Sequence, residues 1–160
     1  MNPTTDSDCC SVPDLAEGAP TVASADPLSA PGKPITILFA CRQNAGRSQI
    51  AAALAGVLAG PNVRVLSAGT TPATEIHPNV ALVLSEAGLE PLSKPTKLDP
   101  ADVEQADWVI TMGCGETCPI FPGVHYEDWD VEDPSDKGII EVRKIRDAIQ
   151  TRVEDLLARI

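Results

Sequence analysis

The sequence predicts an α/β fold, with a parallel sheet covered by helices on both faces. From Pro34 onward, short apolar runs alternate with segments whose apolar residues recur at helical spacing, which is typical of strand–helix–strand units. The 160 residues and the 43% hydrophobic fraction suit one domain with a substantial core. No internal repeat is apparent.

The first half of the predicted domain contains two strands and two helices. Ile35–Ala40 is a short apolar run that predicts a buried strand, and the following helix should bury Ile50, Leu54, Val57 and Leu58. Val63–Leu66 predicts the second strand. Pro78 suits the first position of the next helix, whose stripe is Val80, Val83 and Leu84, and Gly88 suits its C-terminal cap.

The second half continues the alternation. Asp99-Pro100 predicts a capped helix start, with Asp102 favourable in the first turn. Trp108–Met112 predicts the third strand, and the less apolar run Val124–Trp129 predicts the fourth. A long C-terminal amphipathic helix should bury Val142, Ile145, Ile149, Val153, Leu156 and Ile160.

Residues 1–33 differ in composition from the rest of the chain. They contain five prolines, many small polar residues, and five acidic residues against one basic residue, Lys33. Such a segment cannot bury enough apolar area to offset its ordering entropy, so we expect a disordered or loosely docked tail before a catalytic domain over 34–160. The tail's Cys9-Cys10 pair is either incidental, a contact for a soft metal, or an extra redox pair.

Charge and composition narrow the function. The formal net charge of −11 disfavours nucleic acid and anionic membranes as partners, and an anionic substrate would need a site with its own positive potential. The first 30 residues contain no Lys or Arg and no long apolar run, so we expect a cytoplasmic protein without a signal peptide or membrane span. Five cysteines in that compartment are expected to be reactive or metal-binding.

The segment that carries the chemistry lies between the first strand and the first helix. At such a turn, backbone N–H groups and the positive end of the helix dipole form a nest for anions. Cys41 can be a thiolate nucleophile there, and Arg47, six residues later, can grip two oxygens of a tetrahedral oxyanion. The Ser48 hydroxyl can donate to the thiolate, and Asn44 can brace the loop. The predicted oxyanion-binding and thiolate-stabilising residues are Arg42, Gln43, Asn44, Ala45, Gly46, Arg47 and Ser48.

Asp133-Pro134 follows the fourth predicted strand. By itself this dipeptide indicates a turn. A displacement at an oxyanion, however, needs a proton for the departing oxygen, and an Asp held over the nest can supply it. Because the Cys41 loop is present in the same chain, we favour Asp133 as that acid.

Cys114 and Cys118 follow the third predicted strand on a glycine-containing loop. The carboxyl ends of parallel strands share one edge, so these thiols can approach Cys41 and each other, which favours a redox pair. A zinc half-site would need two more ligands, and neither His77 nor His125 has ligand spacing to this loop. Incidental cysteines are the remaining alternative. We expect His77 to open its helix and His125 to lie in a strand.

Together these motifs closely resemble the arsenate reductases built on the low-molecular-weight tyrosine phosphatase fold, over about residues 34–160. The resemblance implies a three-layer sandwich with a four-stranded parallel sheet. It also implies Cys41 as nucleophile, Arg47 as oxyanion ligand and Asp133 as proton donor. It rests on Cys41 to Ser48, Ser67-Ala68-Gly69, Cys114, Cys118 and Asp133-Pro134.

Details of the resemblance point to a reductase. Gln49 stands where phosphatases tend to have Pro, and Ser135-Asp136 replaces the Tyr pair with which phosphatases hold an aromatic substrate. The spacing of Cys114 and Cys118 is shorter than is usual in the thioredoxin-coupled group and looks more like that in mycothiol-using bacteria. The reductant therefore stays open between a thioredoxin-like protein and mycothiol with mycoredoxin.

The expected reaction is reduction of arsenate to arsenite, with a thiol reductant as co-substrate and no bound cofactor or metal. In it, Cys41 attacks arsenic, Cys114 then attacks Cys41, and Cys118 takes over the disulfide. One alternative is a low-molecular-weight protein tyrosine phosphatase, which uses the same loop and Asp133. Another is a non-catalytic thiol protein that binds arsenite or a soft metal through Cys9, Cys10, Cys114 and Cys118.

Overall fold

The computed structural model describes residues 34–113 and 119–160. Within them, four strands form one sheet in the order β2-β1-β3-β4, and every neighbouring pair is parallel. The predicted α/β fold with a four-stranded parallel sheet is confirmed. The strands are β1 (Ile35–Cys41), β2 (Val63–Gly69), β3 (Trp108–Met112) and β4 (His125–Asp128).

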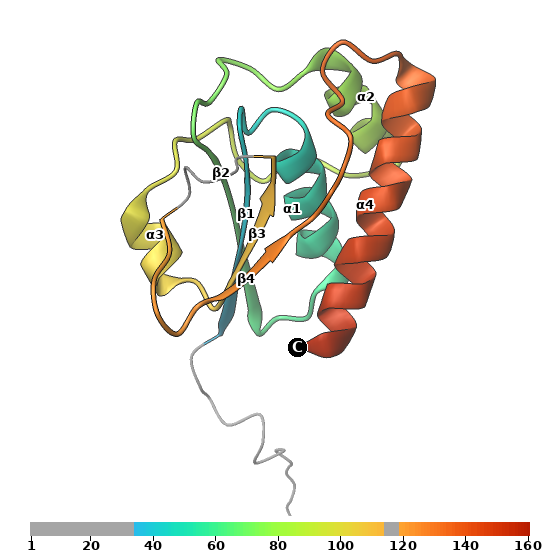
Figure 1. The fold of residues 1–160 in the computed structure, drawn as a ribbon. Coiled ribbons are helices and arrows are strands. Elements are labelled where there is room, and N and C mark those ends of the chain that lie inside the picture. Colours follow the sequence, from blue (N-terminus) through green and yellow to red (C-terminus); the bar gives the residue numbers. More distant parts are fainter. Residues whose placement is uncertain (1–33, 114–118) are drawn as a thin grey trace, which may run out of the picture. The chain divides into compact units, whose positions relative to one another are not determined.

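Helices cover both faces of this sheet (Figure 1). One face carries α1 (Arg47–Leu58), α2 (Pro78–Glu86) and the long α4 (Ile139–Arg159), which packs on both α1 and α2. The other face carries the short α3 (Pro100–Gln105). The predicted three layers are therefore present, with most of the helical mass on one side.

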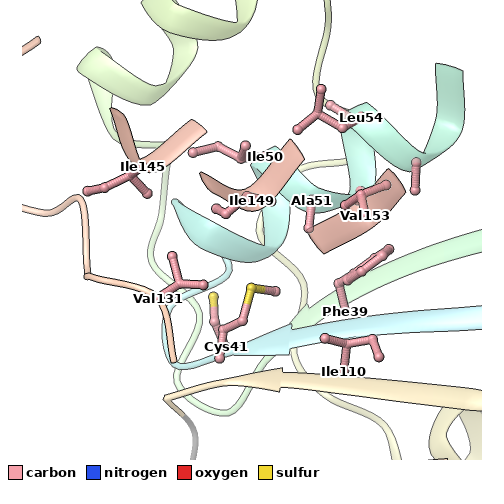
Figure 2. Packing of buried hydrophobic residues seen from close by; sticks show 14 of the residues in the cluster. Phe39, Cys41, Ile50, Ala51, Leu54, Ile110, Val131, Ile145, Ile149 and Val153 are labelled. Carbon is pink, nitrogen blue, oxygen red and sulfur yellow. The ribbon is translucent and has the colours of Figure 1, made fainter. Parts of the chain in front are cut away.

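The side chains of β1 alternate between two cores. Ile37, Phe39 and Cys41 belong to the larger core under α1 and α4, whereas Leu38 and Ala40 face the α3 side. Figure 2 shows Cys41 at the end of β1, below the apolar side chains of α1 and α4. A central parallel strand is covered on both faces, which explains why its sequence is a continuous apolar run.

Two strands run further than predicted. β1 ends at Cys41 instead of Ala40, and β2 ends at Gly69 instead of Leu66. Cys41 pairs in register with Gly69 and with Met112 of β3. The predicted nucleophile thus occupies the last position of a central strand, where both neighbouring strands restrict its backbone.

The buried face predicted for the first helix is only partly right. Ile50 and Leu54 are buried, but Val57 is 67% exposed and Leu58 is 44% exposed. The alanines of α1 occupy the interior instead, because their small side chains let the helix lie close between the sheet and α4. The fourth strand is also shorter than the predicted Val124–Trp129.

Helix ends agree with the sequence. Pro78 opens α2, and the chain leaves that helix through Gly88 in the left-handed region, at φ 73°. The Asp99 carboxylate accepts a hydrogen bond from the Ala101 N–H at 2.9 Å and caps α3. The predicted stripe of α4 is buried from Val142 to Leu156.

No helix in the described parts of the chain is both long and apolar enough to cross a membrane. The predicted N-terminal tail, with Cys9 and Cys10, lies outside the described residues. Its predicted looseness therefore stays a prediction.

Candidate active site

A cavity of about 150 Å³ lies at the carboxyl edge of the sheet. Pockets for drug-sized molecules have volumes of roughly 300–1,000 Å³, so this one suits a small ion. The end of β1, the following loop, the start of α1 and two segments distant in sequence converge on it. The residues that line it are Cys41, Arg42, Gln43, Gly46, Arg47, His77 and Asp133.

The carbonyl groups of the Cys41–Gly46 loop are turned away from the cavity. Four of them accept hydrogen bonds, at 2.8–3.2 Å, from backbone N–H groups of the segment after β2. In a trans peptide the C=O and N–H point in opposite directions. The N–H of each following residue therefore points away from the segment after β2, toward the side of the loop where Cys41 lies. The acceptors are Cys41, Arg42, Gln43 and Ala45, and their donors are Thr70, Thr71, Ala73 and His77.

The start of α1 adds to this nest. Gly46 occupies the N-cap position and has no side chain with which to cap the helix. The first-turn N–H groups are therefore available to an anion, which would also meet the positive end of the helix dipole. The loop and the start of α1 therefore have a backbone geometry suited to an anion, and oxyanion binding by these residues stays a prediction.

Two hydrogen-bonding groups lie against the Cys41 sulfur. The Asn44 N–H donates to Sγ at 3.2 Å, and the Ser48 hydroxyl lies 2.9 Å from Sγ. The Asn44 Oδ1 accepts from the Thr96 N–H at 2.8 Å, which directs Nδ2 toward the Ser48 oxygen at 2.7 Å. Because Ser48 accepts that bond, its own hydrogen is free for the sulfur. This network stabilises negative charge on Cys41.

Asn44 and Gln49 brace the loop. Asn44 has φ 50°, in the left-handed region that Asn tolerates better than most residues. The side-chain amide of the fully buried Gln49 donates to the Asn44 carbonyl at 2.9 Å. A proline at this position has no amide with which to make that bond. The sequence feature that distinguished this chain from phosphatases therefore has a physical counterpart.

Gly69 allows β2 to end close against the same loop. A Cβ atom there would lie 2.8 Å from both the Arg42 carbonyl oxygen and the Asn44 nitrogen. Any side chain would push the loop out of place. This contact explains the glycine in Ser67-Ala68-Gly69.

Arg47 joins α1 to the loop after β4. Its Nη1 donates to the Val131 carbonyl at 3.1 Å, and its Nη2 lies 3.5 Å from Asp133 Oδ2. Gly113, at φ 88° just after β3, makes room for it, because a Cβ there would lie 2.7 Å from Nη1. The guanidinium is thus held between the ends of β3 and β4.

Asp133 reaches the cavity from the loop after β4, as predicted. Partial burial raises the pKa of its carboxyl group, but hydrogen bonding from Ser135 and the charges of Arg47 and His77 outweigh burial. The net result is an Asp133 pKa below its ordinary value. Asp133 is therefore ionised at neutral pH and paired with Arg47.

His77 is a cavity residue that the sequence reasoning missed. It was expected to open its helix, and it does stand at the N-cap of α2. Its backbone N–H also donates to the Ala45 carbonyl at 3.0 Å, which ties it to the oxyanion loop. The sequence contained one indication of this position. His77 follows β2, and the carboxyl ends of parallel strands lie at the same edge of the sheet, where the Cys41 loop also lies. His125 lies in β4, as predicted.

Aromatic side chains in the described residues are engaged away from the cavity. Phe39 and Trp129 pack in the core with ring centroids 5.8 Å apart, and Trp108 stacks on His125. The Tyr126 hydroxyl accepts from the Phe121 N–H at 2.7 Å. None of them lines the cavity.

Four of the five cysteines lie outside the described residues. Cys114 and Cys118 lie outside the described residues, as do Cys9 and Cys10, so the redox pair stays a prediction. Within residues 34–113 and 119–160, no three His, Cys, Asp or Glu side chains gather as metal ligands.

Solved structures similar to this chain include both reductases and phosphatases. A thioredoxin-dependent arsenate reductase from Corynebacterium glutamicum is 42% identical with a TM-score of 0.72, and the match covers 83% of this chain and 65% of that one. This chain thus spans slightly less than two thirds of the C. glutamicum protein. An arginine phosphatase from Geobacillus stearothermophilus is 30% identical with a TM-score of 0.69, over 79% of this chain and 92% of that one.

Curated relatives agree with these structures. A glutaredoxin arsenate reductase from Synechocystis sp. is 31% identical over 131 residues, which are 78% of this chain and 97% of the relative. The family described as low molecular weight phosphotyrosine protein phosphatase matches residues 36–160. This range contains the cavity and every strand and helix above, apart from Ile35, the first residue of β1. The chain belongs to the low molecular weight phosphotyrosine protein phosphatase family.

Proposed function

We propose that this chain is an arsenate reductase, an oxidoreductase of arsenical resistance that converts arsenate to arsenite. The observation that carries the proposal is the buried Cys41 sulfur beside an anion nest, in a cavity sized for a small ion. The reductases named among its relatives in C. glutamicum and Synechocystis support it.

The same evidence disfavours the alternative, a tyrosine phosphatase. An aryl phosphate needs an apolar or aromatic wall beside the phosphate site. In the described parts of the chain, the residues lining this cavity are polar or charged, apart from Cys41 and Gly46, and none is aromatic except the imidazole of His77. Arsenate, which has no organic group to hold, fits this lining better.

In the first proposed step, the Cys41 thiolate attacks arsenic. Loop N–H groups and Arg47 hold the oxyanion, and a sulfur–arsenic bond forms as an arsenic–oxygen bond breaks. The departing oxygen leaves as water once it is protonated. Arg47 is close enough to exchange its Asp133 partner for the substrate, because their separation of 3.5 Å is a loose ion pair.

Asp133 is the proposed donor of that proton. The lowered pKa of Asp133 favours the carboxylate over the acid, but a bound anion changes its surroundings. When Arg47 turns toward the substrate and a negative charge arrives beside Asp133, the carboxylate is destabilised. It then takes up a proton, from solvent or hydrogen arsenate, and passes it to the departing oxygen.

In the second proposed step, the Cys114 thiolate attacks the Cys41 sulfur. A sulfur–sulfur bond forms, and the electrons of the sulfur–arsenic bond stay on arsenic, which leaves as arsenite. As(V) is thereby reduced to As(III), while two thiols are oxidised to one disulfide. Attack by Cys118 on Cys114 then releases Cys41 and leaves a Cys114–Cys118 disulfide, a redox-active pair.

The proposed reductant of this disulfide is a thioredoxin-like protein. The thioredoxin dependence of the similar arsenate reductase from C. glutamicum supports this choice. Mycothiol with mycoredoxin is the alternative, in which the small thiol attacks the Cys41–arsenic adduct directly.

The experiment is arsenate-dependent NADPH oxidation with thioredoxin and its reductase, run in parallel with mycothiol and mycoredoxin. Turnover with thioredoxin that is lost in Cys114→Ser supports the relay. Cys118→Ser should release about one arsenite per enzyme and then stall with Cys41 joined to Cys114, which mass spectrometry of trapped mixtures can identify. If both variants turn over normally with mycothiol, the relay is wrong.

The phosphatase alternative has its own test. A phosphotyrosine peptide and a phosphoarginine peptide should be hydrolysed with lower kcat/KM than arsenate is reduced. No arsenate reduction with any reductant, together with efficient hydrolysis of either peptide, would replace the proposed function.

A further inference from the structure

Among the described residues that line the cavity, His77 has no task in the chemistry above. We propose that His77 is a further oxyanion-binding residue, whose protonated imidazole pairs with the bound anion and strengthens its binding below neutral pH. The proposal rests on the proposed function for the identity of the substrate, arsenate. The geometry applies equally to inorganic phosphate, the same tetrahedral chemistry without the redox step.

The backbone of His77 is tied to the loop that binds the anion. Its N–H donates to the Ala45 carbonyl at 3.0 Å, and Pro78 after it restricts the chain. The imidazole Cδ2 lies 3.4 Å from the position of a Cβ on Gly46, so the ring edge packs over the loop. The His77 side chain makes no capping hydrogen bond to α2, so this helix does not engage the ring.

The charge of the His77 side chain would affect anion binding in this cavity. The whole chain carries −11, so the cavity must be locally positive to attract an anion. Its lining residues include two cationic ones, Arg42 and Arg47, against one acidic residue, Asp133, which is paired with Arg47. A protonated His77 adds a third positive charge to this small volume. Imidazole is the side chain that ordinarily changes charge between about pH 5 and 8.

The other groups around His77 come from two elements. The loop and the start of α1 contribute a thiol and two guanidinium groups, and the loop after β4 contributes two carboxylates and an ammonium. Carboxylates, lysine and arginine keep their charge between about pH 6 and 8. The thiol and the bound anion can change their charge in this pH range. A test must therefore compare variant with wild type at each pH, so that their contributions to binding cancel. These neighbours are Cys41, Arg42, Arg47, Asp133, Asp136 and Lys137.

The first experiment measures binding of inorganic phosphate without turnover. Bound phosphate should protect Cys41 from iodoacetamide, so mass spectrometry of the Cys41 peptide can give a Kd at about pH 6 and about pH 8. His77→Asn keeps a good N-cap residue for α2 and removes the charge. It should weaken phosphate binding on the order of tenfold relative to wild type at the lower pH, and less than about twofold at the higher pH.

Two variants sharpen the reading. His125→Asn is the matched control, because His125 stacks on Trp108 at the other end of the strands, and it should bind phosphate as wild type does. His77→Lys should restore binding at both pH values. If His77→Asn binds like wild type at both pH values, or is weakened equally at both without rescue by Lys, the proposal is wrong.

A second measurement does not depend on a folded His77 variant. The chain has two histidines, so in a tag-free His125→Asn protein the imidazole resonance belongs to His77 alone. Saturating phosphate should move the pH midpoint of that resonance upward, because an anion that prefers the protonated ring also favours its protonation. An unchanged midpoint would contradict the proposal. Failure of arsenate reduction in wild type would overturn the proposed function and leave both phosphate measurements interpretable.

Discussion

The two ends of the sheet use polar residues in opposite ways. At the carboxyl end, Asn44, Ser48 and Gln49 are fully buried and bond to one another, to Cys41 and to the loop backbone. At the other end, where α4 finishes (Figure 1), Arg159 forms two 3.0 Å bonds to Glu127 and lies 5.8 Å from the Trp108 ring centre. Both partners of that ion pair are partly exposed.

The two ends differ in whether water can replace a hydrogen-bond or ion-pair partner that a mutation removes. At the exposed end, water can solvate a charge whose partner is removed, so such a pair is worth about 0.2–1 kcal/mol. At the buried end, a polar group left without its partner keeps its full desolvation cost. Changes near the cavity should therefore affect chemistry strongly, and changes at the α4 end should affect only stability.

The largest expected effect is that of Cys41→Ser. A serine hydroxyl is not ionised in this nest, so arsenate reduction should fall on the order of 10³-fold or more. The replacement is nearly isosteric, and the circular dichroism spectrum and Tm should stay close to those of wild type. Substantial single-turnover arsenite release by the folded variant would remove Cys41 from the mechanism.

Asp133→Asn should lower kcat by about 10²–10⁴-fold, because the amide cannot deliver a proton. Glu132→Gln is a matched control, since that neighbouring carboxylate pairs with Lys137 outside the cavity. Its kcat should be close to that of wild type. Single-turnover rates over a range of pH test the assignment, and an unchanged chemical step in Asp133→Asn would transfer the acid role to another group.

Gly113→Ala should reduce kcat/KM by about 10–10²-fold, because its Cβ would displace the Arg47 guanidinium from the mouth of the site. Gly123→Ala is the matched control that separates the contact with Arg47 from the effect of backbone strain. Gly123 has nearly the same φ, 85° against 88°, but its added Cβ would meet nothing within 4 Å. Both variants should lose similar stability, and only Gly113→Ala should lose activity. Equal activity losses would mean that backbone strain is responsible.

The smallest expected effect is that of Glu127→Gln. Hydrogen bonding from Arg159, and then from Trp129, lowers the Glu127 pKa in the folded protein despite partial burial. The ion pair therefore stabilises the fold above the ordinary Glu pKa of about 4.3, and this stability is lost as pH falls through the lowered value. The variant should be about 0.2–1 kcal/mol less stable near neutral pH.

Urea denaturation at several pH values checks the sign. The stability difference between wild type and Glu127→Gln should shrink below about pH 4. Arsenate reduction by the variant should match wild type throughout. A difference that grows on acidification would contradict the pairing.

The sequence alone determined the order of the elements and the local geometry of the loop from Cys41 to Ser48. Local signals marked the elements and agree with the structure. They are the apolar periodicity, Pro78 and Asp99 at the starts of two helices, and Gly88 at the end of one. The spacing from Cys41 to Ser48 also acts locally, because an anion nest is made by consecutive residues. These features need no knowledge of distant contacts.

Only the tertiary structure decided which distant residues meet at the cavity. His77 follows β2, Gly113 follows β3 and Val131 follows β4, and none has a local signal for its contact with the loop or Arg47. The exposure of Val57 and Leu58 was likewise decided by packing, since α4 covers the alanine side of α1. Such contacts depend on the parallel sheet, which brings the carboxyl ends of separate strands to one edge.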